Sequence, residues 1–276
     1  MKKFNRVFTV LIFIFLYVPM AVLIVASFDT GKSLAGFESF TLQQYVRLFK
    51  DRTLLKLLGN SILLSVLASG IATVFGTVAA VGINGLNPRM RKTVMTLTNI
   101  PMTNPDIVTG VSLALLFAFV GTVLKKNHVM GFTTLLIAHI TFDMPYVILS
   151  VMPKLTQMDP DLQEAALDLG CTPVQSFFKV VLHEILPGVV SGALMAFTMS
   201  LDDFVISYFV YGPSFVTLPV EIYNYTKKPL QPKIYALFTL LFLVILALMV
   251  LMNLLQLRDS KRTASRRKHR GEEGAA

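Results

Sequence analysis

The membrane character of this chain is clearest in residues 234–257, which read IYALFTLLFLVILALMVLMNLLQL. This stretch holds 24 consecutive residues without a charged side chain. The hydrocarbon core of a bilayer is about 30 Å thick, and an α-helix of about 20 apolar residues crosses it. Five further apolar blocks precede this one, at residues 7–28, 55–83, 93–120, 132–152 and 185–210. The pattern therefore predicts six membrane-spanning helices.

The overall composition agrees with this prediction. Hydrophobic residues make up 54% of the 276 residues and charged residues 15%, whereas soluble domains carry about 25% charged residues. Only helices and closed barrels satisfy the backbone in lipid, and the alternating strands of a barrel are not visible. The first block, residues 7–28, is longer than the apolar core of a signal peptide, which spans about 7–15 residues. We therefore expect an all-α, multi-pass membrane protein that keeps its first span.

The distribution of Lys and Arg predicts the orientation in the membrane. Six spans bring both ends of the chain to one side, and that side holds 15 of the 25 Lys and Arg, seven of them within residues 258–270. Basic residues are enriched in cytoplasmic segments, so we expect both termini in the cytoplasm. Residues 1–257 are expected to form the transmembrane domain, with a cytoplasmic loop at 153–184. Residues 258–276 are expected to form a basic, disordered cytoplasmic tail.

Several functional classes are disfavoured by the sequence. The net charge of +9 is concentrated after the last span, so no binding of nucleic acid is expected. Cys171 is the only cysteine, and no Cys or His residues at metal-ligand spacing predict a metal site. Gly31-Lys32-Ser33 resembles the end of a phosphate-binding loop, but it follows a span on the external side instead of joining a strand to a helix. We therefore do not expect this chain to bind ATP.

The loop at 153–184 predicts two short helices separated by a sharp turn. Asp159 is a good N-cap, and Pro160 suits the first helical position. Gly170 can adopt the left-handed conformation that ends a helix, and Thr172 with Gln175 matches a capping box for the second helix. The first helix is expected to expose Gln163, Glu164 and Asp168. The second is expected to present an apolar face of Val174, Phe177, Phe178 and Val181. An amphipathic loop that lies on the lipid is the alternative.

The same loop resembles a known family. Glu164-Ala165-Ala166, followed after three residues by Gly170, is similar to the EAA loop of binding-protein-dependent ABC import permeases. In that family a proline follows the second helix, whereas this chain has His183 at that position and Pro187 later. The resemblance implies that the loop docks into an ATPase subunit. It also implies that the residues that couple the two subunits are Glu164, Ala165, Ala166 and Gly170.

Other segments resemble the polyamine branch of this family, the spermidine/putrescine or PotC type. These segments are NPDIV at 104–108, HITF at 139–142, FTMSLDD at 197–203 and FVYGPS at 209–214. The resemblance implies the ABC importer permease fold in a bacterial plasma (inner) membrane, and import of spermidine or putrescine by alternating access. It implies as partners a second, PotB-like permease, two PotA-like ATPases and an external PotD-like binding protein, beside membrane lipid. ATP and Mg would bind the ATPases, and this chain would have no cofactor and no catalytic residues of its own.

Acidic residues in the predicted spans indicate where a cation could pass. An Asp at the centre of a spanning helix costs about 2.5–3.5 kcal/mol to insert, so such residues are expected to face the interior or an aqueous path. A polyamine is a flexible polycation, which carboxylates and aromatic faces can bind. The residues expected along the substrate path are Asp106, Asp202, Asp203, Phe204 and Tyr208.

The two adjacent acids are expected to play different parts. Asp203 follows Ser200 by three residues and precedes Ser207 by four, so a continuous fifth span would place all three on one face. Asp202 would then point about 100° away. We expect one of the two to line the path and the other to make a structural hydrogen bond.

The remaining ionisable groups in the predicted spans could have structural roles instead of lining the substrate path. Asp106 follows Pro105, where the third span is expected to break, and an acid there can also stabilise a helix N-terminus. His139 and Asp143 are four residues apart and share one helix face. We expect them to form a hydrogen-bonded pair inside the bundle instead of a substrate or metal site.

Small residues recur at every fourth position in two spans. The second span carries Ala68, Ala72, Gly76 and Ala80, and the fifth carries Gly188, Gly192, Ala196 and Ser200. Such stripes allow helix backbones to approach closely in a membrane. We expect both stripes to pack inside the bundle.

Three other functions stay open from the sequence. The chain could be a permease for another small solute, such as thiamine, iron or phosphonate, although the Asp residues disfavour an anion. It could be an unrelated proton-coupled carrier, which would work without an ATPase. It could also be a polytopic membrane enzyme such as an intramembrane protease, but Asp202 and Asp203 are adjacent on one segment and cannot face each other as a catalytic dyad.

Overall fold

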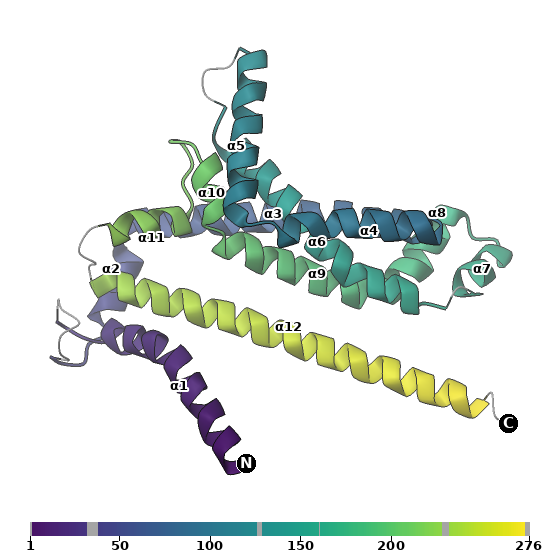
Figure 1. Ribbon diagram of the computed structural model, residues 1–276, viewed down its shortest axis with the longest axis horizontal. Coiled ribbons are helices and arrows are strands. Elements are labelled where there is room, and N and C mark those ends of the chain that lie inside the picture. Colours follow the sequence, from purple (N-terminus) through teal and green to yellow (C-terminus); the bar gives the residue numbers. More distant parts are fainter. Residues whose placement is uncertain (1, 32–37, 126–128, 160, 228–231, 274–276) are drawn as a thin grey trace. The chain divides into compact units, whose positions relative to one another are not determined.

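The computed structural model describes residues 2–31, 38–125, 129–159, 161–227 and 232–273, and these are almost entirely helical (Figure 1). Within these ranges the β structure consists of two isolated bridges, Asp29 with Phe40 and Gly212 with Phe215. Lys32, Ser33 and Pro160 lie outside the described residues. The elements are α1 (Lys2–Ser27), α2 (Gln43–Lys50), α3 (Arg52–Asn84), α4 (Pro88–Thr103), α5 (Asp106–Val123), α6 (Phe132–Gln157), α7 (Asp161–Asp168), α8 (Pro173–Ser176), the π-helical turn η1 (Phe177–Val181), α9 (Leu182–Asp202), α10 (Val205–Val210), α11 (Leu218–Thr226) and α12 (Pro232–Glu273).

Six helical stretches within the described residues are long and apolar enough to cross a membrane, as the sequence predicts. They are Arg6–Ser27, Arg52–Asn84, Asp106–Val123, Phe132–Gln157, Pro173–Asp202 and Pro232–Leu251. The prediction of an all-α membrane protein with six spans is confirmed. Two of the six differ from the predicted blocks in ways that matter for function.

The third predicted block, residues 93–120, is divided between two helices. α4 ends at Thr103 and α5 begins at Asp106, with Asn104 and Pro105 in extended conformations between them. Pro105 disfavours the helical conformation for the residue before it and has no N–H to donate. The expected break is therefore confirmed, whereas Pro101 lies inside α4 without ending it. The candidate span begins only at Asp106.

The fifth predicted block, residues 185–210, is wrong at both ends. The helix begins at Pro173, because α8, η1 and α9 follow one another without interruption. The second helix predicted in the loop at 153–184 is thus the start of the span, and neither His183 nor Pro187 ends it. At the other end the helix stops at Asp202, since Asp203 is extended (φ −64°, ψ 120°), and α10 restarts at Val205.

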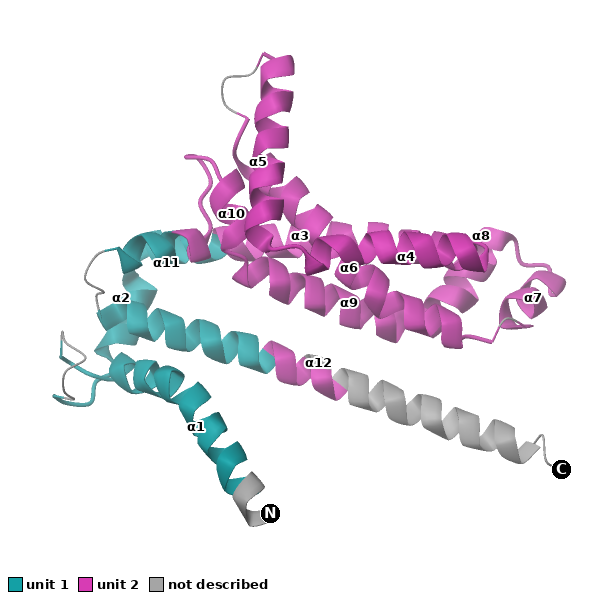
Figure 2. Ribbon diagram, viewed as in Figure 1, with its two compact units in different colours: residues 1–59, 221–247 teal, residues 60–220, 248–276 magenta. Residues whose placement is uncertain are grey.

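The chain forms two compact units, which Figure 2 distinguishes by colour. Unit 1 comprises Met1–Gly59 and Glu221–Ala247, and unit 2 comprises Asn60–Val220 and Leu248–Ala276. All of the acids expected along the substrate path, and the whole loop at 153–184, belong to unit 2. Unit 2 therefore contains the candidate functional residues.

Two carboxylates near helix ends, Asp29 and Asp51, make hydrogen bonds within unit 1. Asp29 Oδ1 accepts hydrogen bonds from the backbone N–H groups of Glu38 and Ser39, at 3.0 and 3.3 Å. Burial raises the pKa of Asp29, but its backbone hydrogen bonds outweigh this and bring the pKa below its ordinary value. Asp51 Oδ2 accepts a hydrogen bond from Lys233 Nζ at 2.8 Å, which lowers the pKa of Asp51. The contribution of Asp51 to stability is therefore present at neutral pH and is lost only as the pH falls through this lowered pKa.

The centre of unit 2 is α6, with α9 beside it (Figure 1). The predicted small-residue stripes are buried as expected. A Cβ on Gly188 would lie 2.8 Å from the backbone oxygen of Ser150, and one on Gly192 would lie 3.1 Å from the Cα of Val147. A Cβ on Gly76 of α3 would lie 2.8 Å from the Cβ of Val147. Glycine therefore lets both α3 and α9 approach α6 closely.

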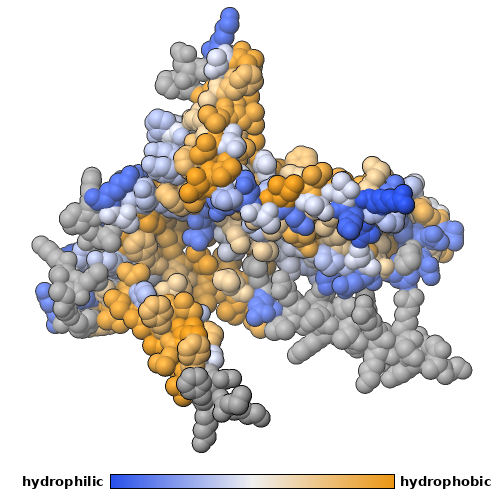
Figure 3. Space-filling view, viewed as in Figure 1, coloured by the Kyte–Doolittle hydropathy of each residue, from blue (hydrophilic) through white to orange (hydrophobic). Residues whose placement is uncertain are grey.

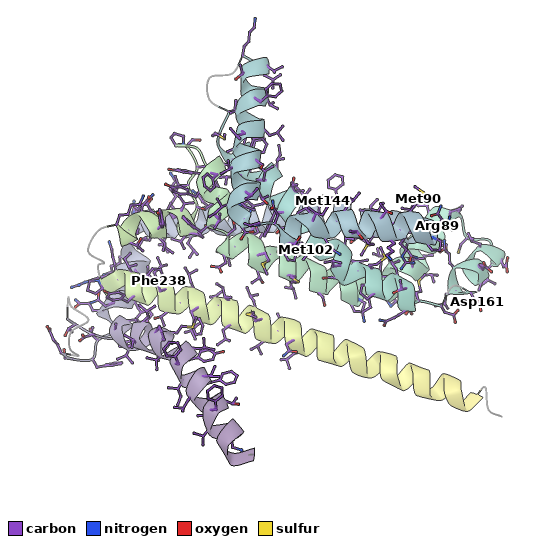
Figure 4. All side chains as sticks on the ribbon, viewed as in Figure 1. Arg89, Met90, Met102, Met144, Asp161 and Phe238 are labelled. Atoms are coloured by element: carbon purple, nitrogen blue, oxygen red, sulfur yellow. The ribbon has the colours of Figure 1, made fainter. Side chains whose placement is uncertain are left out.

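The two loops expected on the cytoplasmic side lie at one end of unit 2. Arg89 at the start of α4 and Asp161 at the start of α7 are labelled at this end in Figure 4. Arg91 of α4 reaches the sulfur of Met152 in α6 at 3.7 Å. The same end has a hydrophilic surface in Figure 3, whereas α5 has an apolar surface with Ile107, Leu115 and Phe119 exposed.

The last helix extends beyond the predicted span into the basic tail. α12 continues as a helix to Glu273, well past residue 258. No proline interrupts the sequence between these residues, and Ala, Arg and Lys are favourable helix formers. The helix of the last span can therefore propagate into the tail without a stop signal.

Candidate functional site

Two helix breaks define the candidate site in unit 2. At the first, Asp106 is the first residue of α5, and its side chain is exposed. Asn104 Nδ2 donates a hydrogen bond to the hydroxyl of Thr109 at 3.3 Å, which ties the break to the second turn of α5. The first N–H groups of a helix lack partners within the helix and carry partial positive charge, so an acid at this position is stabilised.

At the second break, Asp203 starts a new helix. Its Oδ1 accepts a hydrogen bond from the N–H of Ile206 at 3.2 Å, and its Oδ2 accepts one from the N–H of Ser207 at 2.7 Å. These are the free donors of the first turn of α10, so Asp203 acts as an N-cap for this helix. The capping explains why the fifth span ends at Asp202, where the sequence predicted a continuous helix.

His139 of α6 joins the two sides of this second break. Its Nδ1 lies 2.7 Å from the hydroxyl of Ser200 in α9, and its Nε2 lies 2.9 Å from the hydroxyl of Ser207 in α10. The carboxylate of Asp203 is 3.5 Å from Nε2. Ser200, Asp203 and Ser207 therefore do converge on one side, as predicted, although they do so around His139 and across a break.

The two breaks are adjacent because α5 packs against α10. A Cβ on Gly110, one turn after Asp106, would lie 2.9 Å from the ring of Phe209 and 3.4 Å from the Cα of Ile206. Figure 1 shows α10 beside α5. The absence of a side chain at Gly110 thus lets α5, one turn after Asp106, approach the first turn of α10 closely.

Three acids lie at these two breaks, Asp106 at the first and Asp202 and Asp203 at the second. Asp143 lies in α6 one turn after His139, whose Nε2 is 3.5 Å from the carboxylate of Asp203. Asp202 is exposed, whereas the side chain of Asp203 is only 7% exposed. Of the adjacent pair, Asp203 therefore makes the structural hydrogen bonds, and Asp202 is the more exposed acid.

The predicted pair of His139 and Asp143 is wrong. Both ring nitrogens of His139 are engaged by serine hydroxyls. Asp143 is completely buried, and neither of its carboxylate oxygens has a hydrogen-bond partner within the part of the chain that the structure describes. A shared helix face made the pair plausible, but Ser200 and Ser207 reach the ring from other helices, and sequence spacing does not show such contacts.

Aromatic rings follow the acids along α10. The rings of Phe204 and Tyr208 lie 5.4 Å apart between centroids, and those of Tyr208 and Tyr211 lie 6.2 Å apart. Carboxylates and aromatic faces together can bind an ammonium group and its methylene neighbours. Among the described residues no group of three His, Cys, Asp or Glu side chains could hold a metal ion.

The loop at 153–184 forms the turn that the sequence predicts. Gly170 has a φ of +85°, and the N–H of Cys171 donates to the oxygen of Ala166 while the N–H of Gly170 donates to that of Leu167. This is a Schellman ending of α7. Thr172 and Gln175 form the expected capping box, with hydrogen bonds of 3.1 and 3.3 Å.

The predicted coupling residues are mostly accessible. Glu164, Ala165 and Gly170 are exposed, as are Gln163 and Asp168, whereas Ala166 is buried. The predicted apolar face of the second loop helix is partly exposed and partly buried. Val174 and Phe178 are 65% and 61% exposed. Val181 belongs to the core that α6 and α9 share, and Phe177 packs against it.

Comparisons with known proteins agree on one family. The sequence model of the family described as "Binding-protein-dependent transport system inner membrane component" matches residues 72–264. The chain is 35% identical over 238 residues to "Putrescine transport system permease protein PotI" of Escherichia coli (strain K12), covering 83% of this chain and 82% of that protein. It is 36% identical over 237 residues to "Spermidine/putrescine transport system permease protein PotC" of Haemophilus influenzae, covering 86% and 90%.

Solved structures show the same fold at lower identity. One is described as a bacterial ABC transporter involved in the import of the acidic polysaccharide alginate, with a TM-score of 0.70 and 16% identity, covering 93% of this chain and 95% of that chain. A second is the bacterial alginate ABC transporter in complex with an alginate pentasaccharide-bound periplasmic protein, with a TM-score of 0.68 and 17% identity, covering 94% and 95%. At these identities the similarity concerns the fold.

Proposed function

This chain belongs to the binding-protein-dependent transport system inner membrane components, and from that premise we propose that it is the membrane-spanning permease subunit of an ATP-driven polyamine importer. Its fold is that of ABC importer permeases. Two relatives that it covers over more than four fifths of their length are named for putrescine and for spermidine/putrescine transport. The substrate is accordingly a small organic polycation, which passes from an external binding protein to the cytoplasm by alternating access.

The observation that carries the choice of a cation is the meeting of acids at two helix breaks. Asp106 at the start of α5 and Asp203 at the start of α10 lie on helices that are in contact through Gly110. Interrupted helices near the middle of a membrane are a common way to build a transport site, because their free ends and side chains face the path. An anionic solute would be repelled by this cluster.

The path is formed by acids followed by aromatic rings. Asp202 and Asp106 are exposed and offer carboxylates to an ammonium group, while Asp203 combines a path role with the capping of α10. Phe204 and Tyr208 supply ring faces for the methylene segments. Several weak binding positions, one after another along the path, suit transport better than one tight site, since the substrate must also leave.

The loop between α6 and α9 couples the permease to its energy source. Glu164, Ala165, Ala166 and Gly170 dock on a PotA-like ATPase, two copies of which bind ATP and Mg and perform the hydrolysis. A PotB-like permease and an external PotD-like binding protein complete the importer. The chain lies in the bacterial inner membrane with both termini in the cytoplasm, and it performs no catalysis.

Uptake of labelled spermidine tests the proposal directly. Cells without their own polyamine importers would be supplied with this chain and its neighbouring transporter subunits. We expect saturable uptake that putrescine competes with and that stops when the ATPase subunit is inactivated. Uptake that survives ATPase inactivation would instead indicate a proton-coupled carrier, and an assembled complex that takes up no polyamine would remove the substrate assignment.

The coupling role makes a separate prediction at Gly170. A Cβ at this position would meet nothing within 4 Å, so a substitution acts only through the backbone, whose φ is +85°. A β-branched residue there loses about 1–2 kcal/mol, whereas Asn tolerates this conformation. We expect Gly170→Val to lower uptake several-fold and to weaken stimulation of the ATPase, with Gly170→Asn close to wild type. Equal uptake activity of the Val and Asn variants would show that the turn at Gly170 does not couple the permease to the ATPase subunits.

A further inference from the structure

Among the described residues of unit 2, Asp143 stands out as a fully buried acid without a hydrogen-bond partner. It lies in the middle of the fourth span, its exposure is 0%, and neither carboxylate oxygen has a hydrogen-bond partner among the described residues. Buried polar groups in proteins are nearly always hydrogen-bonded, and an exception calls for an explanation. Acids inside spanning helices are also costly, and they commonly mark the path of a substrate or ion.

The packing around Asp143 offers it no substitute partner. Val147, one turn later in α6, abuts Gly76 of α3 and Gly192 of α9. His139, one turn earlier, is bonded to Ser200 of α9. By this register Ala72 and Ala196 lie at the level of Asp143, and both are fully buried. Since their side chains end at Cβ, neither can donate a hydrogen bond.

The electrostatic surroundings are also unfavourable for an isolated carboxylate. Asp143 lies one turn after His139 in α6, and the carboxylate of Asp203 is 3.5 Å from the Nε2 of His139. Asp143 therefore extends the group of acids at the helix breaks into the contact between α6 and its neighbours.

We propose that Asp143 is a further ammonium-binding position of the substrate path, which takes one ammonium group of a polyamine while Asp203 or Asp202 holds another. The inference rests on the proposed function and adds to it a reason for preferring substrates with two or more ammonium groups. In the state described, α3 and α9 close over Asp143. Alternating access separates helices of the bundle, and this separation admits the ammonium group to the carboxylate.

The test measures selectivity as well as rate. In the uptake assay, n-butylamine, putrescine and spermidine would compete with labelled spermidine for the wild type, Asp143→Asn and Asp143→Glu. Asn keeps the shape and removes the charge. We expect Asp143→Asn to raise the KM for spermidine by at least about tenfold and to reduce the advantage of putrescine over n-butylamine. Asp143→Glu should bring the KM for spermidine and the preference for putrescine part of the way back to the wild-type values. Glu38→Gln, which removes a carboxylate from an exposed loop, should leave both quantities unchanged.

A second measurement does not depend on the folding of a variant. A hydrophobic carbodiimide would be applied to the wild-type complex, and modification of Asp143 would be followed by mass spectrometry. We expect spermidine to protect Asp143, with little protection by n-butylamine at the same concentration. Unchanged KM and selectivity in a well-assembled Asp143→Asn complex, or equal modification with and without spermidine, would overturn the proposal. Failure of the wild type to take up any polyamine would instead overturn the proposed function.

Discussion

Replacing Asp203 by Ala is expected to lower uptake of spermidine by more than about tenfold and to reduce the stability of the assembled complex. The substitution removes two hydrogen bonds from the start of α10, to the N–H groups of Ile206 and Ser207. It also removes the carboxylate beside His139, at 3.5 Å. Uptake assays and thermal unfolding of the purified complex measure the two consequences separately.

Asp203→Asn separates the charge of this residue from its capping role. The amide oxygen of Asn can still accept a hydrogen bond from the first turn of α10, so we expect the unfolding temperature to stay near wild type. Uptake should nevertheless fall sharply, because a neutral amide attracts an ammonium group much less. Glu38→Gln, in an exposed loop of unit 1, serves as the matched loss of a carboxylate. Wild-type uptake by Asp203→Asn would reduce Asp203 to a structural cap and leave the path to Asp202 and Asp106.

Signals that are local in the sequence predicted the structure well. Pro105 ends a helix through its own ring, so the break before Asp106 could be located from one residue. The positive φ of Gly170 and the capping box of Thr172 likewise depend on a few neighbouring residues, and all appear as expected. The six spans were predictable because the length of an apolar run alone decides whether it can cross a bilayer.

Features that depend on contacts between helices could not be predicted. The break at Asp203 contains no Gly or Pro. It results from the carboxylate of Asp203, which accepts hydrogen bonds from the first turn of α10. His139 was assigned to Asp143 because both lie on one helix face, yet its partners come from α9 and α10. The isolation of Asp143 follows from Ala72 and Ala196 on two other helices. A single sequence does not contain the register of these helices against α6.

The small-residue stripe of α9 predicts the largest structural effect. Gly188→Leu is expected to force α9 away from α6, because even a Cβ at Gly188 would lie 2.8 Å from the backbone oxygen of Ser150, which cannot turn aside as a side chain would. Overpacking of this kind costs about 1–3 kcal/mol, and occasionally more. We expect little monodisperse complex after detergent extraction and a clearly lower unfolding temperature. Gly70→Leu is the matched control, because Gly70 of α3 is exposed and a Cβ there would meet nothing within 4 Å. If the two variants unfold at the same temperature, close contact of α6 and α9 is not what stabilises unit 2.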